Sequence, residues 1–520
     1  MRHRGLSLLL LAALATPALA APVVAPGFSP MFNLSQASDT NAASTVAQIA
    51  FGPDNRLYVA RAFQPMLSFA LDSSGQLFDP QPTSVGPALG VAFATHTTPD
   101  DPTPRPYMYV SRQATSFEAS LSRYSNPNSD TTWGGGGEVN VDLVRGVPIG
   151  DHAMNQIAVR GNQLFVGIGI RTSNGQAGLD TAGVYRDEPA GPVSGGGFFN
   201  FQGTGFSYGE TSYGGTISTI GNLASVPSAT SAAQLRDGPN GTTGNLLAGR
   251  DALLFTNPTT DQPNPLALIP LTSTAEDKLT VHSAGTRNGF GIAAGPDGEI
   301  YFTNNFGRAS ATSGSGGYTS HFRDRTDADL ANDIHDQLFR AIAGANYGYD
   351  IAGLPASTSS SQPALSITPD ALYSSRPGFN TLHNSAAPVG LGPSSSSNGL
   401  EVFTADLSLA SAAGVPAGER LWALVTRWNS GVSESSPGTD AIPYADLVLV
   451  DIATGATWRI ASGFTNPIDV AYDGRLGFYI ADFGDGTIYR AGLFPVIPEP
   501  AGPLTVLFVA AAILLRQRRV

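Results

Sequence analysis

A short hairpin pattern that recurs along the chain constrains the fold most strongly. Its clearest copy covers residues 288–303, where an apolar segment leads through a Gly-Pro-Asp-Gly turn at 295–298 into an alternating segment with Ile300 and Phe302. Alternating apolar residues on both sides of such a turn predict a β-hairpin. A single hairpin cannot bury its own faces, so the copies must stack on one another.

Similar units occupy residues 48–61, 156–169 and 469–482. A further copy at 86–112 contains the insertion TTPDDPTPRP at 97–106, which is expected to be an exposed loop. Regularity is weakest over 172–262, where a strand is expected only at 251–256. The last strands are expected at 400–403, 420–426, 445–451 and within 458–490. The sequence therefore predicts an all-β chain folded as a six-bladed β-propeller over residues 45–493.

The two ends of the chain carry export signals. Residues 1–20 combine early arginines, an apolar run and an Ala-Leu-Ala site, which is typical of a secretory signal peptide. Residues 21–44 are expected to form an extended lead-in. At the other end, Pro498-Glu499-Pro500 precedes an apolar run at 501–515, expected to be helical, and the cluster Arg516-Gln517-Arg518-Arg519. This run is short for a membrane span, although a tail anchor is one interpretation of it.

The C-terminal pattern at 496–520 closely resembles the PEP-CTERM sorting signal of exopolysaccharide-producing Gram-negative bacteria. The resemblance implies processing by an exosortase, after signal peptidase has acted at the other end. It also implies transient anchoring in the inner membrane through 501–515, and a mature form that does not span the membrane. The expected location is the cell surface or the extracellular matrix.

The charge of the chain excludes several partners. Removing both signals leaves 23 basic and 40 acidic residues, a net charge of −17. Such a chain is not expected to bind nucleic acid or an anionic membrane surface. It has no cysteine, which excludes disulfides, thiol catalysis and cysteine metal sites. Sequences typical of zinc metalloproteases, P-loop proteins and α/β-hydrolases are also absent.

Four segments, in order, resemble the soluble glucose/sorbosone dehydrogenase family. They are ALGVAFATH with PYMYVSR (88–112), DHAMNQIAVRGNQLFVGIG (151–169), GTRNGFGIAAGPDGEIYFTNN (285–305) and DQLFRAIAGANYGYD (336–350). Two shorter segments, at 386–391 and 465–474, extend the similarity to the last blade. Members of this family are six-bladed propellers that use pyrroloquinoline quinone (PQQ) and calcium.

The resemblance implies roles for five residues. His152 would be the catalytic base, Arg287 and Asn288 would bind the cofactor, and Asp336 and Tyr347 would lie at the calcium site. A neutral imidazole can take the hydroxyl proton while the quinone accepts hydride, and a guanidinium can bind a cofactor carboxylate. Because each precedes a strand at the same phase of its repeat, His152, Arg287 and Asn288 are expected at one end of the propeller.

The chain also departs from the family pattern. Gln337 stands where an acidic residue is expected, and Asn466 and Ile468 stand where the family has arginines. The loss of anionic and cationic groups weakens both a calcium site and a site for a tricarboxylate cofactor. Two interpretations therefore remain open: an exported sugar or polyol dehydrogenase, and a noncatalytic propeller that binds exopolysaccharide or a surface protein. A metal-dependent lactonase is a third, for which no convergent carboxylate set is visible.

Overall fold

The computed structural model describes residues 21–493 with gaps, of which the longest are 170–206, 235–251, 257–279, 306–334 and 347–379. The predicted signal segment (1–20) and apolar C-terminal helix (501–515) lie outside the described residues. The described chain consists of β-strands and one 3-10 turn, η1 (Leu223–Ser225). None of its helices is both long and apolar enough to cross a membrane.

Six large antiparallel sheets follow one another along the chain. We number them as blades. Blade 1 contains β3 (Val46–Phe51), β4 (Leu57–Arg61), β5 (Leu67–Leu71) and β6 (Leu77–Pro82). Blade 2 contains β7 (Gly90–Thr98), β8 (Asp101–Gln113), β9 (Glu118–Ser125) and β10 (Val139–Pro148). Blade 3 contains β11 (Met154–Arg160), β12 (Gln163–Ile168), β14 (Gly215–Ile220) and β17 (Thr280–Thr286).

Blades 4 to 6 continue the same pattern. They comprise β18 (Gly289–Ala294), β19 (Ile300–Asn304), β20 (His335–Arg340) and β23 (Val389–Pro393); β24 (Ser397–Asp406), β25 (Glu419–Arg427), β28 (Asp446–Asp451) and β29 (Thr457–Ser462); and β30 (Pro467–Tyr472), β31 (Gly477–Asp482), β32 (Thr487–Leu493) and β2 (Phe32–Gln36). Short strands extend some edges: β15 (Ala233–Gln234) on blade 2, β21 (Ala345–Asn346) and β22 (Asn380–Thr381) on blade 3, and β1 (Val23–Val24) on blade 5.

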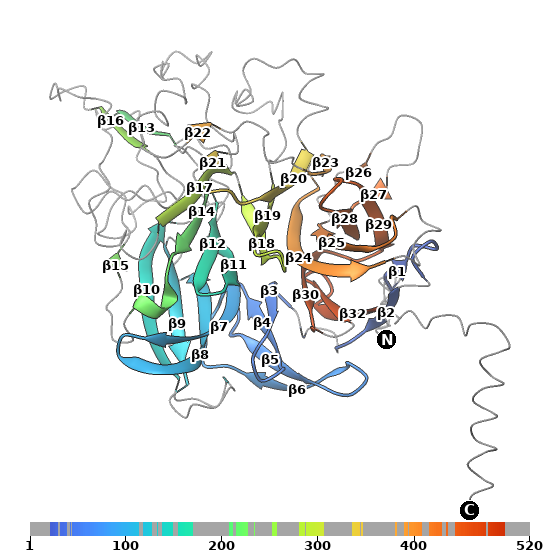
Figure 1. The fold of residues 1–520 in the computed structure, drawn as a ribbon, viewed down its shortest axis with the longest axis horizontal. Coiled ribbons are helices and arrows are strands. Elements are labelled where there is room, and N and C mark those ends of the chain that lie inside the picture. Colours follow the sequence, from blue (N-terminus) through green and yellow to red (C-terminus); the bar gives the residue numbers. More distant parts are fainter. Residues whose placement is uncertain are drawn as a thin grey trace, which may run out of the picture.

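The innermost strands close into a ring. Each innermost strand contacts the next one: β3 contacts β7, β7 contacts β11, β11 contacts β18, β18 contacts β24, and β24 contacts β30. Strand β30 in turn contacts β3. Figure 1 looks along the short axis of the molecule and shows the six blades arranged around this centre. In such a ring the sheets pack face to face, and the sheet edges that remain are short. The predicted six-bladed β-propeller is therefore confirmed.

Each innermost strand starts at the same end of the propeller. The first residue of β3 pairs with Arg61, that of β18 with Asn304, and that of β30 with Asp482. We call this end the top face, and the opposite end, which carries the Gly-Pro-Asp turns, the bottom face. Loops before the innermost strands and loops after the second strands therefore meet on the top face.

The N-terminal segment closes the ring. Strand β2 is the outermost strand of blade 6, where Phe32 pairs with Leu493, and β1 pairs with β29 in blade 5. Residues 21–44 were expected to be an extended lead-in; their described part contributes strands to two blades, with a turn at 26–29 between them. Blade 6 is thus built from segments near both ends of the chain.

Neighbouring innermost strands approach each other closely at one repeated position. A Cβ atom on Gly291 would overlap the carbonyl oxygen of Asn398, and one on Gly399 would overlap the backbone of Asp469. Blades 4 and 5 therefore require glycine at this position. Irregular strand pairing, typical of β-bulges, occurs at or beside the same phase in both blades.

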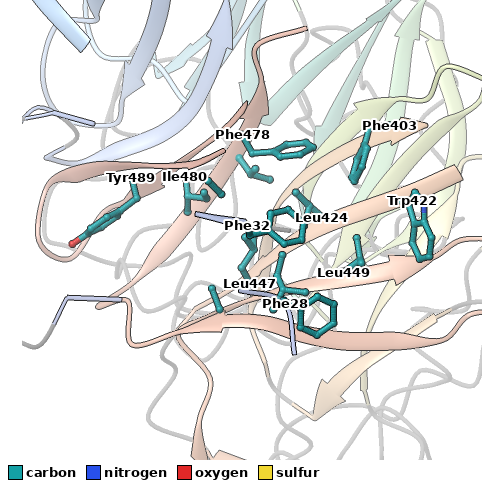
Figure 2. Packing of buried hydrophobic residues seen from close by; sticks show 14 of the residues in the cluster. Phe28, Phe32, Phe403, Trp422, Leu424, Leu447, Leu449, Phe478, Ile480 and Tyr489 are labelled. Carbon is teal, nitrogen blue, oxygen red and sulfur yellow. The ribbon is translucent and has the colours of Figure 1, made fainter. Parts of the chain in front are cut away.

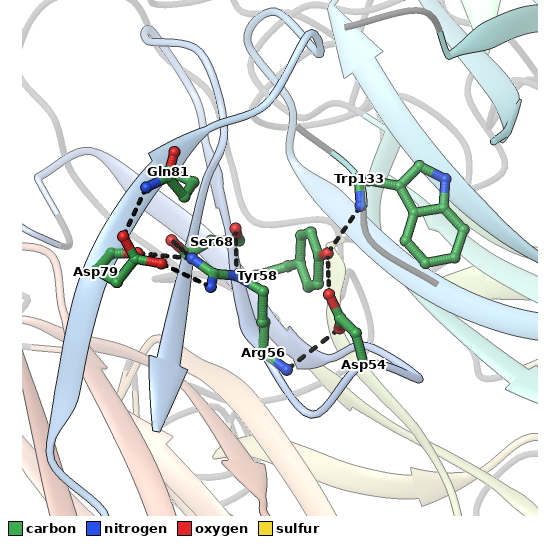
Figure 3. Close-up of polar contacts among 7 residues, drawn as sticks. All are labelled: Asp54, Arg56, Tyr58, Ser68, Asp79, Gln81 and Trp133. Atoms are coloured by element: carbon green, nitrogen blue, oxygen red, sulfur yellow. Dashed lines mark hydrogen bonds and ion pairs between the residues drawn. The ribbon is translucent and has the colours of Figure 1, made fainter. Parts of the chain in front are cut away.

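The bottom-face turns share a side-chain bond. The hydroxyl of Tyr58 donates to Asp54 Oδ2 at 2.8 Å, and that of Tyr301 donates to Asp297 Oδ2 at 2.8 Å. In blade 1 the same hydroxyl accepts the backbone N–H of Trp133 at 3.2 Å, which ties the β9–β10 connection to this turn (Figure 3).

The predicted hairpin at 288–303 is confirmed, with its two strands as β18 and β19.

Apolar side chains fill the spaces between blades. The largest such cluster lies between blades 5 and 6 and includes Trp422, Leu424 and Leu449 from blade 5 and Phe478 from blade 6 (Figure 2). Phe32 of the N-terminal segment is buried in the same cluster, so closure of the ring and packing of the core depend on each other.

One local expectation is corrected, and another is confirmed with an unforeseen partner. Residues 97–106 are not a loop: β7 runs to Thr98 and β8 begins at Asp101, which leaves a two-residue turn. The two strands stay paired through this segment, where His96 pairs with Arg105. Arg105 also forms an ion pair with Asp101 at 2.5 Å. The strand expected at 251–256 exists as β16 (Ala252–Thr256), but it pairs with β13 (Ser207–Thr211) in a separate two-stranded sheet.

Candidate functional site

Four blades carry an equivalent loop on the top face. In each, the N–H of the residue after the second strand donates to the carbonyl of the residue immediately before the innermost strand. The donor and acceptor residues are Ala62 and Thr45 (2.8 Å), Asn305 and Asn288 (3.1 Å), Trp428 and Ser396 (3.1 Å), and Phe483 and Asn466 (2.9 Å). Because the bond is the same in blades 1, 4, 5 and 6, side chains at these positions are related by the rotation of the ring.

Asparagine side chains connect blades 3, 4 and 5 on this face. Asn155 Nδ2 donates to Asn288 Oδ1 at 2.7 Å, and the N–H of Asn288 donates to Asn304 Oδ1 at 3.2 Å. Asn305 Nδ2 donates to Asn398 Oδ1 at 3.1 Å. Each amide carries both a donor and an acceptor. Together these residues form an uncharged polar arc over half of the top face, in which Asn288 is half-buried and the other asparagines are buried.

Aromatic side chains continue the arc over blades 5 and 6. The rings of Trp428 and Phe483 lie 5.2 Å apart at an interplanar angle of 53°. Both rings are half-buried, and with Phe290 of blade 4 they pack against the core cluster that contains Ile468. We call the asparagines at positions 155, 288, 305 and 398, together with Trp428 and Phe483, the top-face arc.

Two buried carboxylates support the loops of the top face. Asp482 accepts the N–H groups of Thr465 at 2.6 Å and of Asn466 at 2.7 Å, and burial raises its pKa. Asp336 is 1% exposed and accepts the hydroxyl of Ser395 at 3.1 Å. Each carboxylate is therefore bonded to the protein and fixes a loop that carries part of the arc.

Hydrogen bonds cross the centre of the ring beneath the top face. Gln48 of blade 1 exchanges two bonds with the backbone of Ile157 in blade 3, at 3.0 and 3.1 Å, and accepts the N–H of Val91 at 2.7 Å. Gln156 Nε2 returns a bond to the carbonyl of Ala47 at 2.8 Å. Because blades 1 and 3 are not neighbours, these bonds tie the innermost strands together across the axis.

Two of the five predicted site residues can be placed. Asn288 is half-buried on the top face and bonded to Asn155, which lies three residues after His152. Asp336 is buried beside Ser395 at the same end. His152, Arg287 and Tyr347 lie outside the described residues, so their convergence with Asn288 stays a prediction.

The described residues alone do not complete a site for PQQ and calcium, because His152, Arg287 and Tyr347 lie outside them. No group of three or more histidine, aspartate or glutamate side chains gathers among them to hold a metal ion. Two top-face arginines are committed elsewhere: Arg427 binds Asp446 through two bonds of 2.7 and 2.5 Å, and Arg61 donates to Gln64 Oε1 at 2.7 Å. Ile468 is 8% exposed within the apolar core. In the described part of the top face near Asn288, the side chains are uncharged amides and aromatic rings.

The arc contains residues that the sequence patterns missed. Asn155, Asn305 and Asn398 lie next to recognised strands, but no local motif marks them. Trp428 and Phe483 could have been predicted, because each directly follows the second strand of its blade, as Asn305 does. An alignment of the repeats with one another would have placed these side chains on the same face.

No family profile and no curated sequence matches the chain. Among solved structures, it is similar to a calcium structure of the carbohydrate-active enzymes family AA12 from Trichoderma reesei (14% identity, 91% of this chain and 97% of the other, TM-score 0.49). The chain is also similar to the PQQ domain of pyranose dehydrogenase from Coprinopsis cinerea (11% identity, 91% of this chain and 97% of the other, TM-score 0.47). A third similar structure is the soluble aldose sugar dehydrogenase of Escherichia coli (12% identity, 89% of this chain and 99% of the other, TM-score 0.41). At these identities the similarity concerns the fold.

Proposed function

We propose that this chain is an exported β-propeller that binds a sugar or polyol on its top face. The observation that carries the proposal is the top-face arc, in which two half-buried aromatic rings, tilted against each other, lie on the same face as the half-buried amide of Asn288. A sugar ring has an apolar face and a rim of hydroxyls. The rings of Trp428 and Phe483 suit the apolar face, and the half-buried amide of Asn288 carries groups that can donate to and accept from hydroxyls. The buried amides of Asn155, Asn305 and Asn398 hold this part of the face in place.

Export is part of the proposal and is supported by the sequence. The signal at 1–20 would be removed by signal peptidase, and the pattern at 496–520 would be processed by an exosortase. The mature protein would then meet its ligand at the cell surface or in the extracellular matrix. Its negative charge agrees with a neutral ligand rather than a polyanion.

A second candidate function is the PQQ-dependent oxidation of the same sugar. The bond between Asn155 and Asn288 favours it, because it joins the starts of β11 and β18, the strands that follow His152 and Arg287. PQQ would supply hydride acceptance. In this chain, His152 would take the hydroxyl proton and Arg287 would bind a cofactor carboxylate.

Calorimetric titration of the exported protein with a panel of aldoses and polyols tests the proposal. At least one of them should bind, and Asn288→Ala or Trp428→Phe should weaken its binding about tenfold, the loss of roughly one good contact. Asn33→Ala, an exposed change on β2, is the matched control and should leave the affinity unchanged. If none of the panel binds, or if all three variants behave alike, the proposal is wrong.

Absorbance titration with PQQ and calcium separates the two candidates. Spectral saturation, together with dye reduction that is lost in His152→Ala, would support the dehydrogenase. Sugar binding without saturation would support a binding module, which is the result expected from the described residues.

A further inference from the structure

A third aromatic side chain lies on the blade that follows the top-face arc in the ring. Blade 1 follows blade 6 in the ring, and its loop residue equivalent to Phe483 and Trp428 is Ala62. The next residue, Phe63, is 71% exposed and is the most exposed of the large apolar side chains in the described chain. Three consecutive blades, 5, 6 and 1, therefore present an aromatic residue on the same loop of the same face.

The loop that carries Phe63 is held in place by a buried guanidinium. Arg61 is 8% exposed; its Nε donates to the carbonyl of Pro65 at 2.7 Å, its Nη2 donates to the same oxygen, and its Nη1 donates to Gln64 Oε1 at 2.7 Å. Burial lowers the pKa of Arg61. Burying a charged group is unfavourable unless its hydrogen bonds are satisfied, and here they are satisfied by the loop itself.

Backbone bonds fix both ends of this loop. The N–H of Ala62 donates to Thr45 at 2.8 Å, and the N–H of Met66 donates to Val85 at 3.1 Å. The side chain of Met66 is fully buried in the core between blades 1 and 2. A short loop anchored in this way loses little conformational entropy when a ligand contacts its tip.

We propose that Phe63 is a second stacking site, so that the ligand is a chain of at least two sugar residues. This inference rests on the proposed function. One sugar ring lies over Trp428 and Phe483, and the next contacts Phe63 on the neighbouring blade. Gln64 supplies an amide beside the second ring. An exposed phenylalanine on a braced loop is explained if it is covered when a carbohydrate chain lies across blades 5, 6 and 1.

The test compares ligand lengths in the full exported protein. The probes are glucose and its β-1,4-linked oligomers from cellobiose to cellohexaose, with the maltose series as a second linkage. Wild-type affinity should rise about threefold to tenfold from glucose to the longer oligomers in one series, the effect of one added aromatic contact. Phe63→Ala should abolish this rise and leave glucose affinity unchanged.

Two further variants make the test specific. Phe78→Ala removes a phenylalanine that is 51% exposed on β6, the outer strand of the same blade, and should behave as wild type. Arg61→Lys keeps the charge but loses the guanidinium bonds to the loop, and should reduce only the affinity gained with length.

The outcomes separate this inference from the proposed function. If glucose binds but affinity does not rise with length in either series, the second site does not exist and the proposed function stands. If Phe63→Ala and Phe78→Ala have equal effects, Phe63 is not a ligand contact. If neither glucose nor any oligomer binds the wild-type protein, both proposals are wrong.

Discussion

At the scale of single residues, the inner surface of the ring contains one carboxylate that a simple repeat would not include. Two positions after the close-approach site, five innermost strands carry alanine and β24 carries Glu401. The alanines are Ala50, Ala92, Ala158, Ala293 and Ala471. Glu401 Oε2 accepts the N–H of Tyr472 at 3.2 Å, and burial raises the pKa of Glu401 from 4.5 to about 8. Asp469 stands at the close-approach position of β30, and burial raises its pKa as well.

The raised pKa makes stability depend on pH in a defined direction. Between pH 4.5 and about 8 the unfolded chain loses the proton of Glu401 while the folded chain keeps it. The free energy of unfolding should therefore fall as pH rises through this window, by an amount on the order of a few kcal/mol. Glu401→Gln keeps the bond to Tyr472 and does not titrate, so its profile should be flatter and the variant should be more stable than wild type at pH 8.

Denaturant unfolding at a series of pH values checks this prediction. Asp469 is present in both proteins, so the difference between their profiles isolates Glu401. Glu419→Gln, at an exposed position, is the matched control and should reproduce the wild-type profile. Parallel curves for wild type and Glu401→Gln would show that Glu401 is ionised in the folded protein.

At the scale of strands and turns, the sequence predicted the inner half of each blade better than the outer half. The hairpin at 288–303 was predictable because its turn and its alternation are local signals. The hairpin over 90–113 was missed at its tip, because Pro102 and Pro104 indicate a loop, whereas the strands continue through the pairing of His96 with Arg105. The top-face arc was missed because its asparagines lie far apart in sequence and meet only when the ring closes.

The turn bond between aspartate and tyrosine is predicted to stabilise the blades that contain it. Tyr301→Phe removes the hydroxyl that donates to Asp297 at 2.8 Å and should lower the free energy of unfolding by about 1 kcal/mol. A double-mutant cycle with Asp297→Asn gives the pairwise contribution from equilibrium unfolding. If the two changes are additive, the contact makes no contribution and the backbone alone determines the turn.

At the scale of the whole molecule, closure of the ring is the step on which the rest depends. Bonds across the axis from Gln48 and Gln156, and the arc over blades 3 to 6, exist only when distant segments meet. The last blade is completed by β2, from the other end of the chain. A local sequence pattern can predict a strand but not its partner, so the pairing of β2 with β32 was not foreseen from the sequence of the lead-in.

The N-terminal strand should therefore be essential for stability although it lies outside the repeated hairpins. Phe28 is 5% exposed and Phe32 is 2% exposed, both within the core between blades 5 and 6. Deleting residues 21–36 exposes this core and the free edge of β32, and should abolish cooperative thermal unfolding. Phe32→Ala alone should cost about 3–5 kcal/mol, because it leaves a cavity in a packed core. Asn33→Ala, at the next and exposed position of the same strand, should change stability by less than about 0.5 kcal/mol.

A synthetic peptide of residues 21–38 added to the truncated protein should restore the unfolding transition, because β2 joins blade 6 by pairing with β32. Normal unfolding of the truncated protein without the peptide would mean that blade 6 is stable with three strands, and that β2 covers the ring rather than closes it.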